Sequence, residues 1–168
     1  MVAHENELDA QLGWELGQAI QRIMAASFDR NFEDVIGDYR RIEEDFMNRA
    51  SGNDFHVLET KRRIAEAILL ATHSHRQPFD ICRNAWDDLV RLGFTNLRTR
   101  CTESWWYADC CLLEGQFDIG LAVLEPLIVD MERQVDEAIH SNRSPKGLKE
   151  QLVRLEQLRD KLKAGLRK

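Results

Sequence analysis

Two clusters of imidazole and thiol side chains are the residues best suited to chemistry. They are His73-Ser74-His75 and the adjacent pair Cys110-Cys111. Imidazole nitrogens and thiolates are ligands that zinc prefers, and a thiolate beside an imidazole can act as a nucleophile. However, residues at i and i+2 point to different sides of a helix, and no third His or Cys has ligand-type spacing. We therefore predict no metal site and no catalytic residue, and interpret the thiols as small buried apolar groups.

Other catalytic patterns are missing from the sequence. The carboxylate runs Glu43-Glu44-Asp45 and Asp87-Asp88 stand beside arginines, which is typical of a solvated helix face. There is no glycine-rich phosphate loop, no H-E-x-x-H and no G-x-S-x-G. The sequence therefore predicts neither an enzyme nor a bound cofactor.

Length and composition indicate one globular domain. The chain has 168 residues, of which 43% are hydrophobic and 31% charged, enough to bury a core of its own. No apolar run approaches the roughly 18 residues that span a bilayer. The N-terminal segment is acidic and polar, unlike a signal peptide, and the four cysteines form no C-x-x-C pair. We expect a cytoplasmic protein with reduced thiols and no membrane partner.

Charge is divided unevenly along the chain. From Pro145 onward there are eight Lys and Arg against three Asp and Glu, a balance of +5. The rest holds 23 − 8 = 15 bases and 29 − 3 = 26 acids, a balance of −11. Nucleic-acid surfaces need clustered positive charge, so the acidic body argues against a nucleic-acid partner.

Apolar residues recur at three- and four-residue steps and predict an all-α protein of about seven helices. The predicted single domain, 1–168, divides into a first hairpin (5–52), a second (54–93), a third (100–140) and a C-terminal amphipathic helix (145–167). Residues 95–100 are expected to connect helices, with the fifth helix over about 102–114 and the fourth opening at Pro78. Pro126 predicts a kink in the sixth helix, or its division into two helices.

The second and third hairpins match each other at a spacing of 38 residues. Ile68 aligns with Trp106, and Phe79-Asp80 aligns with Phe117-Asp118. Helical hairpins that repeat in this way bury their apolar faces by stacking on their neighbours. A compact helical bundle would show the same periodicity, because the pattern reports amphipathic helices and not how they are stacked.

The third hairpin resembles the tetratricopeptide repeat family. Ala108, Gly115, Phe117-Asp118 and Gly120 correspond to that family's small residue, turn glycine, aromatic–acid helix start and small packing residue. The resemblance covers about residues 54–130. It departs from the family in length, since the family repeat has 34 residues, and in lacking the closing proline.

The resemblance implies stacked antiparallel hairpins whose first helices line a concave binding face. It places eight residues on that face: Trp105, Asp109, Leu112 and Leu113 from one hairpin, with Ala67, Ala71, Ser74 and His75 from the previous one. Consecutive helical residues are turned by about 100°, so Trp105, Trp106 and Tyr107 cannot all face the same core, and Trp105 is directed elsewhere if the other two pack inward. Trp105 then either anchors a partner in the groove or packs under a terminal helix.

Leucines repeat along the last segment and form a stripe from Leu148 to Leu166. The stripe is expected to cap the stack; a homodimer through this helix and a membrane-surface helix are the alternatives. We interpret the whole chain as a non-catalytic adaptor, chaperone or inhibitor that binds another protein or a peptide segment. The alternative is a helical-bundle enzyme or metal protein that uses His73, His75, Cys110 and Cys111.

Overall fold

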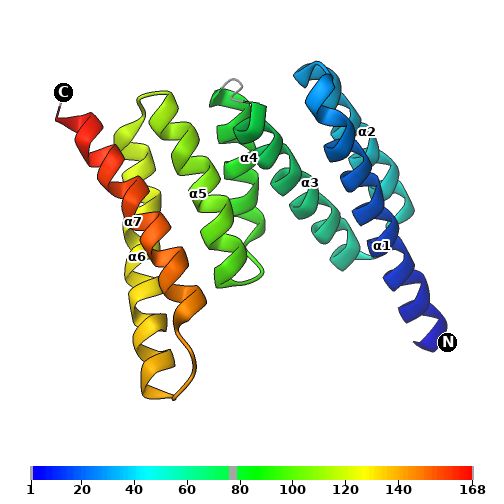
Figure 1. The fold of residues 1–168 in the computed structure, drawn as a ribbon. Helices are drawn as coiled ribbons and strands as arrows, with labels where there is room; N and C mark the ends of the chain where they lie inside the picture. The colour runs from blue at the N-terminus through cyan, green and yellow to red at the C-terminus, as the bar shows by residue number, and fades with distance from the viewer. Residues whose placement is uncertain (1, 76–78, 168) are drawn as a thin grey trace. The chain divides into compact units, whose positions relative to one another are not determined.

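The computed structural model describes residues 2–75 and 79–167, and within these ranges every regular element is helical (Figure 1). The all-α prediction is confirmed, whereas the proposed helix start at Pro78 lies outside the described residues. The elements are α1 (Val2–Ala26), the short 3-10 helix η1 (Ser27–Asp29), α2 (Phe32–Arg49), α3 (Asp54–His75), α4 (Phe79–Leu92), α5 (Leu97–Leu113), α6 (Phe117–His140) and α7 (Lys146–Leu166).

Asparagine side chains mark the N-termini of three helices. Asn31 accepts a hydrogen bond from the backbone N–H of Glu33 at 3.0 Å, and Asn53 accepts one from His56 at 3.3 Å. Asn53 therefore caps α3, whose first helical residue is Asp54. At α5, Asn96 accepts from the N–H of a residue three positions on, at 2.9 Å.

The cap at Asn96 corrects one predicted boundary. Residues 97–100 were expected to lie in a connection, but they form the first turn of α5, which begins at Leu97. Asparagine satisfies an N–H that would otherwise lack a partner, and this favours helix over the polar stretch that follows it. The predicted start near Thr102 was therefore about one turn too late.

Pro126 lies inside α6 without dividing it, because Phe117–His140 is one continuous helix. The predicted alternative of two separate helices is wrong. Proline inside a helix costs about 3 kcal/mol. Leu124 and Leu127 on either side are fully buried, and burying each such side chain contributes about 1.5–3 kcal/mol. This burial on both sides offsets the proline.

The turn between α5 and α6 is centred on Gly115. Its φ is +70°, a left-handed conformation that glycine adopts without a steric penalty. The N–H of Gln116 donates to the carbonyl of Cys111 at 2.8 Å, and the N–H of Gly115 donates to that of Leu112 at 3.3 Å. These two bonds form a Schellman motif, which ends α5 and reverses the chain.

The helices fall into two compact units, Met1–Gly93 and Phe94–Lys168. In the first, α1 and α2 each pack on α3, α1 packs on α2, and α3 packs on α4 (Figure 1). Its core includes Val35, Tyr39, Ile64, Ile68 and Leu89. Each unit thus contains antiparallel neighbours joined by short turns, as expected for helical hairpins.

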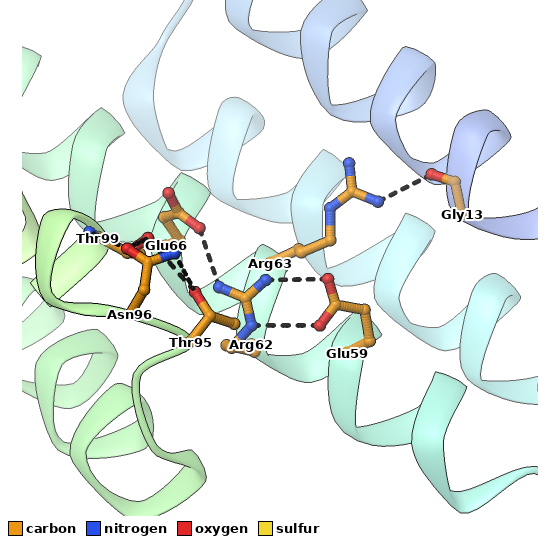
Figure 2. A network of polar contacts seen from close by, with 8 residues as sticks. All are labelled: Gly13, Glu59, Arg62, Arg63, Glu66, Thr95, Asn96 and Thr99. Carbon is orange, nitrogen blue, oxygen red and sulfur yellow. Dashed lines mark hydrogen bonds and ion pairs between the residues drawn. The ribbon is translucent and has the colours of Figure 1, made fainter. Parts of the chain in front are cut away.

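Two arginines of α3 make polar contacts within the first unit (Figure 2). Arg63 donates from Nη1 to the carbonyl oxygen of Gly13 at 2.8 Å, so it links α3 to α1. Arg62 lies along its own helix and donates to both carboxylate oxygens of Glu59, at 2.9 and 3.2 Å, and to Glu66 at 3.4 Å. The contact with a main-chain carbonyl fixes the register of α1 on α3 independently of apolar packing.

In the second unit, α7 packs against both α6 and α5 (Figure 1). Leu155, Leu158 and Leu162 are buried among α5 and α6 side chains. A Cβ placed on Gly120 would lie 2.9 Å from Leu162 Cδ2, so glycine permits the close approach of α6 to α7. The leucine stripe is thus mostly covered by helices of its own chain.

Candidate functional site

The predicted binding residues of α3 differ in exposure. Ala67 and Ala71 are buried, Ser74 is exposed and His75 is half-buried. Ala71, Ser74 and His75 line one recess within the first unit, together with residues of α1, η1 and α2. Ala67 does not line this recess; it belongs to the core.

The predicted binding residues of α5 are also not alike. Trp105 and Leu112 are partly buried and pack against the core of the second unit, whereas Asp109 is half-buried. Leu113 is 53% exposed at the end of the helix. Of the four, Trp105 lines an open pocket, which it shares with α7. The shared groove built from α3 and α5 stays a prediction, while the pocket within each unit is observed.

We call the pocket of the second unit the Trp105 shelf. It has a volume of about 50 Å³ and is lined by Cys101, Thr102, Trp105 and Trp106 of α5 and by Gln151, Arg154 and Leu155 of α7.

Arg154 covers the ring of Trp105 on the shelf. The guanidinium carbon lies 5.1 Å from the ring centroid, within cation–π range. The side chain of Arg154 is solvent-exposed, and no carboxylate of the described residues pairs with it. In contrast, Arg159 pairs with Asp160 at 3.3 Å and Lys163 pairs with Glu125 at 3.0 Å. Arg154 therefore keeps a positive charge that is held in position and available to a partner.

We call the pocket of the first unit the Tyr39 recess. It has a volume of about 280 Å³ and a largely apolar wall, made by Met24, Ala25, Ser27, Phe28, Tyr39, Leu70, Ala71, Ser74 and His75. Phe28 is 81% exposed. The ring of His75 lies 6.5 Å from that of Phe28 and 5.9 Å from that of Phe32. Aromatic rings therefore gather at one side of the recess.

Tyr39 is wholly buried, and its hydroxyl oxygen has no hydrogen-bond partner among the described residues. Burial raises the pKa of this phenol from 10.0 to about 12. The nearby hydroxyl of Ser27 is already used, since it donates to the carbonyl of Met24 at 2.7 Å. In the sequence Tyr39 stands on the apolar stripe of α2, and nothing else in the sequence distinguishes it. A tyrosine on the buried stripe of a helix was the available signal, because its hydroxyl normally finds a partner.

The sulfur and imidazole side chains of the described residues form no cluster of metal ligands, and two of the thiols are poor nucleophiles. No group of three or more His, Cys, Asp or Glu side chains there could hold a metal ion. All four cysteines are buried, and none of them forms a disulfide with another described residue. Burial raises the pKa of Cys101 to about 11 and that of Cys111 to about 12, so both stay protonated near neutral pH, whereas a cysteine nucleophile acts as the thiolate.

Comparisons with protein-family models, with curated proteins and with solved structures each found no match. No helix within the described ranges is long and apolar enough to cross a bilayer.

Proposed function

We propose that this chain is a non-catalytic, cytoplasmic binding module of tetratricopeptide-like hairpins that captures an acidic segment of another protein. The proposal rests on one observation, the exposed guanidinium of Arg154 over the half-buried ring of Trp105 at an open pocket. Trp and Arg are the residue types most enriched at the energetic centres of protein interfaces.

The geometry of the Trp105 shelf suits a carboxylate. Arg154 is held against a flat aromatic ring, so less side-chain entropy is lost when it pairs with a ligand. Its guanidinium can bind a carboxylate through two parallel hydrogen bonds, while the indole beside it packs on the carbon atoms of the same partner residue. Thr102 and Gln151 add hydroxyl and amide groups at the same opening. An Asp or Glu with an apolar neighbour fits this combination.

Charge along α7 favours the same partner. Lys146, Lys149 and Lys161 are exposed, within a C-terminal region whose balance is +5. Positive charge around a binding site accelerates encounter with an acidic partner. The balance of −11 over the rest of the chain opposes a long polyanion such as nucleic acid, but it leaves room for a short acidic segment at α7.

The test compares two charge-reversal variants. Arg154→Glu should abolish capture of the partner from a native-host lysate, because it replaces attraction by repulsion at the centre of the shelf. Arg22→Glu, an exposed arginine on α1, changes net charge equally and should leave capture intact. The recovered protein is then purified and truncated, and binding of its acidic segment is measured by calorimetry. We expect at least a tenfold loss of affinity for Arg154→Glu, equivalent to about 1.4 kcal/mol.

Three outcomes would contradict the proposal. Equal retention of the partner by both variants would place the binding surface elsewhere. Recovery of nucleic acid, lost on nuclease treatment, would identify a polyanion as the ligand. A mass twice that of the chain in light scattering, reduced by Arg154→Glu, would identify the acidic face of a second copy as the occupant.

A further inference from the structure

The Tyr39 recess has the features of a small-molecule site, and it is independent of the Trp105 shelf. Its volume of about 280 Å³ exceeds the roughly 150 Å³ of an engineered apolar cavity that binds benzene. Its lining is mainly hydrocarbon and aromatic, as in most ligand pockets, which add only a few polar groups to orient the ligand. Here the candidate orienting group is the hydroxyl of Tyr39.

A buried hydroxyl without a partner is unfavourable, since it loses its bond to water and gains none. The chain supplies no acceptor to Tyr39 within the described ranges. A water molecule in such a place normally makes about three hydrogen bonds. The wall of the recess offers few groups for them, because Ser27 already donates to Met24 and the remaining lining is mostly apolar. A ligand atom is a better acceptor here than water.

We propose that the Tyr39 recess binds a small, uncharged, apolar molecule that carries one hydrogen-bond acceptor, such as an aromatic ketone, with the acceptor on the Tyr39 hydroxyl. The same desolvation that raises the pKa of Tyr39 also disfavours a carboxylate at this place. An aromatic ring of the ligand can pack against the rings of Phe28 and His75, which line the recess.

Access to the hydroxyl requires a side chain to move. Tyr39 is 0% exposed, so the ligand must reach the base of the recess. Met24 is the flexible member of the wall, because its unbranched side chain adapts to a ligand at little cost. Phe28, which is mostly in solvent, is free to fold over a bound molecule. Met24 lies in the last turn of α1, and Phe28 lies in η1.

The test uses three probes of similar size: acetophenone, its hydrocarbon counterpart α-methylstyrene, and benzoate. Amide chemical shifts of the full-length protein report on binding. Acetophenone should shift the signals of Met24, Ala71 and Ser74 and bind about fivefold more tightly than α-methylstyrene, the ratio expected for one hydrogen bond of about 1 kcal/mol. In Tyr39→Phe the preference should vanish, with the two neutral probes binding equally. Benzoate should bind more weakly than either.

Thermal unfolding without ligand provides the second readout. Tyr39→Phe should unfold at the same temperature as wild type or higher, because it removes a hydroxyl without a partner. Tyr107→Phe, the matched control, should unfold at a lower temperature, since the Tyr107 side chain hydrogen-bonds to Cys111. Tyr107→Phe should also leave the preference for the ketone unchanged.

Several results would overturn the inference. Equal binding of ketone and hydrocarbon by the wild type would mean that the hydroxyl takes no part. A lowered unfolding temperature in Tyr39→Phe would show that a water or a protein group already satisfies it. Absence of shifts at millimolar probe would mean that the recess is closed in solution.

Discussion

Adding one methyl group at Gly120 tests whether α7 packs on its own chain. Gly120 lies on α6 and faces α7, where a Cβ would stand 2.9 and 3.0 Å from the two terminal carbons of Leu162 and 3.2 Å from Cβ of Cys111. Real Cβ contacts are almost never shorter than 3.0 Å. Leu162 is fully buried in the core of the second unit, so its side chain has little space in which to move.

Two opposing terms set the magnitude for Gly120→Ala. Alanine is favoured over glycine inside a helix by about 1 kcal/mol. Overpacking a well-filled core costs about 1–3 kcal/mol. The free energy of unfolding should therefore fall by about 0–2 kcal/mol. Gly37→Ala in α2 is the matched control, since a Cβ there meets nothing within 4 Å. It should gain about 0.5–1 kcal/mol.

Urea unfolding followed by circular dichroism measures both variants, and a double variant isolates the contact. Leu162→Ala alone should cost about 2–5 kcal/mol. In the Leu162→Ala background, Gly120→Ala should no longer lower the free energy of unfolding. It should raise it instead, as Gly37→Ala does. If Gly120→Ala stabilised the wild-type protein as much as Gly37→Ala does, Leu162 of α7 would not pack against Gly120 of α6 in solution. A dimer formed through α7 would then be the explanation to test by light scattering.

Three further predictions follow from single contacts. Arg63→Gln removes the hydrogen bond to the carbonyl of Gly13 and should lower the free energy of unfolding by about 1 kcal/mol. Faster hydrogen exchange in α1 would show this loss. Lys61→Gln, at an exposed neighbouring position, should leave the exchange rates unchanged. Raising the pH above about 8, where unfolded thiols begin to ionise, should lower the free energy of unfolding. Folding raises the pKa of Cys101, Cys111 and Tyr39, so the unfolded chain releases protons that the native chain keeps. Thermal midpoints across pH 8–11 measure this fall, and a shallower fall in Tyr39→Phe identifies the phenol. Arg154→Ala should remove about 0.5–1 kcal/mol and alter tryptophan emission, and an unchanged spectrum would mean that Arg154 does not cover Trp105 in solution.

The helices themselves were predictable because local chemistry specifies them. Apolar residues at three- and four-residue steps indicated every helix, and Gly115 indicated the turn before α6, where its positive φ is observed. The two wrong predictions, the start of α5 and the division of α6, came from residues whose local sequence is compatible with two structures. Asn96 extended α5 over a polar stretch that resembled a connection. Pro126 was read as a possible helix end, but burial on both sides kept α6 continuous.

The sequence predicted only some of the residues of the two pockets. Trp105 was singled out from three consecutive aromatics, and Ala71, Ser74 and His75 from the resemblance to the tetratricopeptide repeat family. Their companions were not, because Arg154 is 49 positions beyond Trp105 and Tyr39 is 36 positions before His75. A helical period shows which residues share a face, but it does not show which helix that face meets.

The sequence by itself determined the all-α class, the helix faces and the uneven charge, since these depend on spacing and composition within short stretches. Only the tertiary structure decided which side chains meet. It placed Arg154 over Trp105 through the packing of α7 on α5, and it buried the hydroxyl of Tyr39 with no hydrogen-bond partner among the described residues. Such contacts join residues far apart in the chain, and they depend on how each helix is rotated against its neighbour, a quantity that periodicity does not contain.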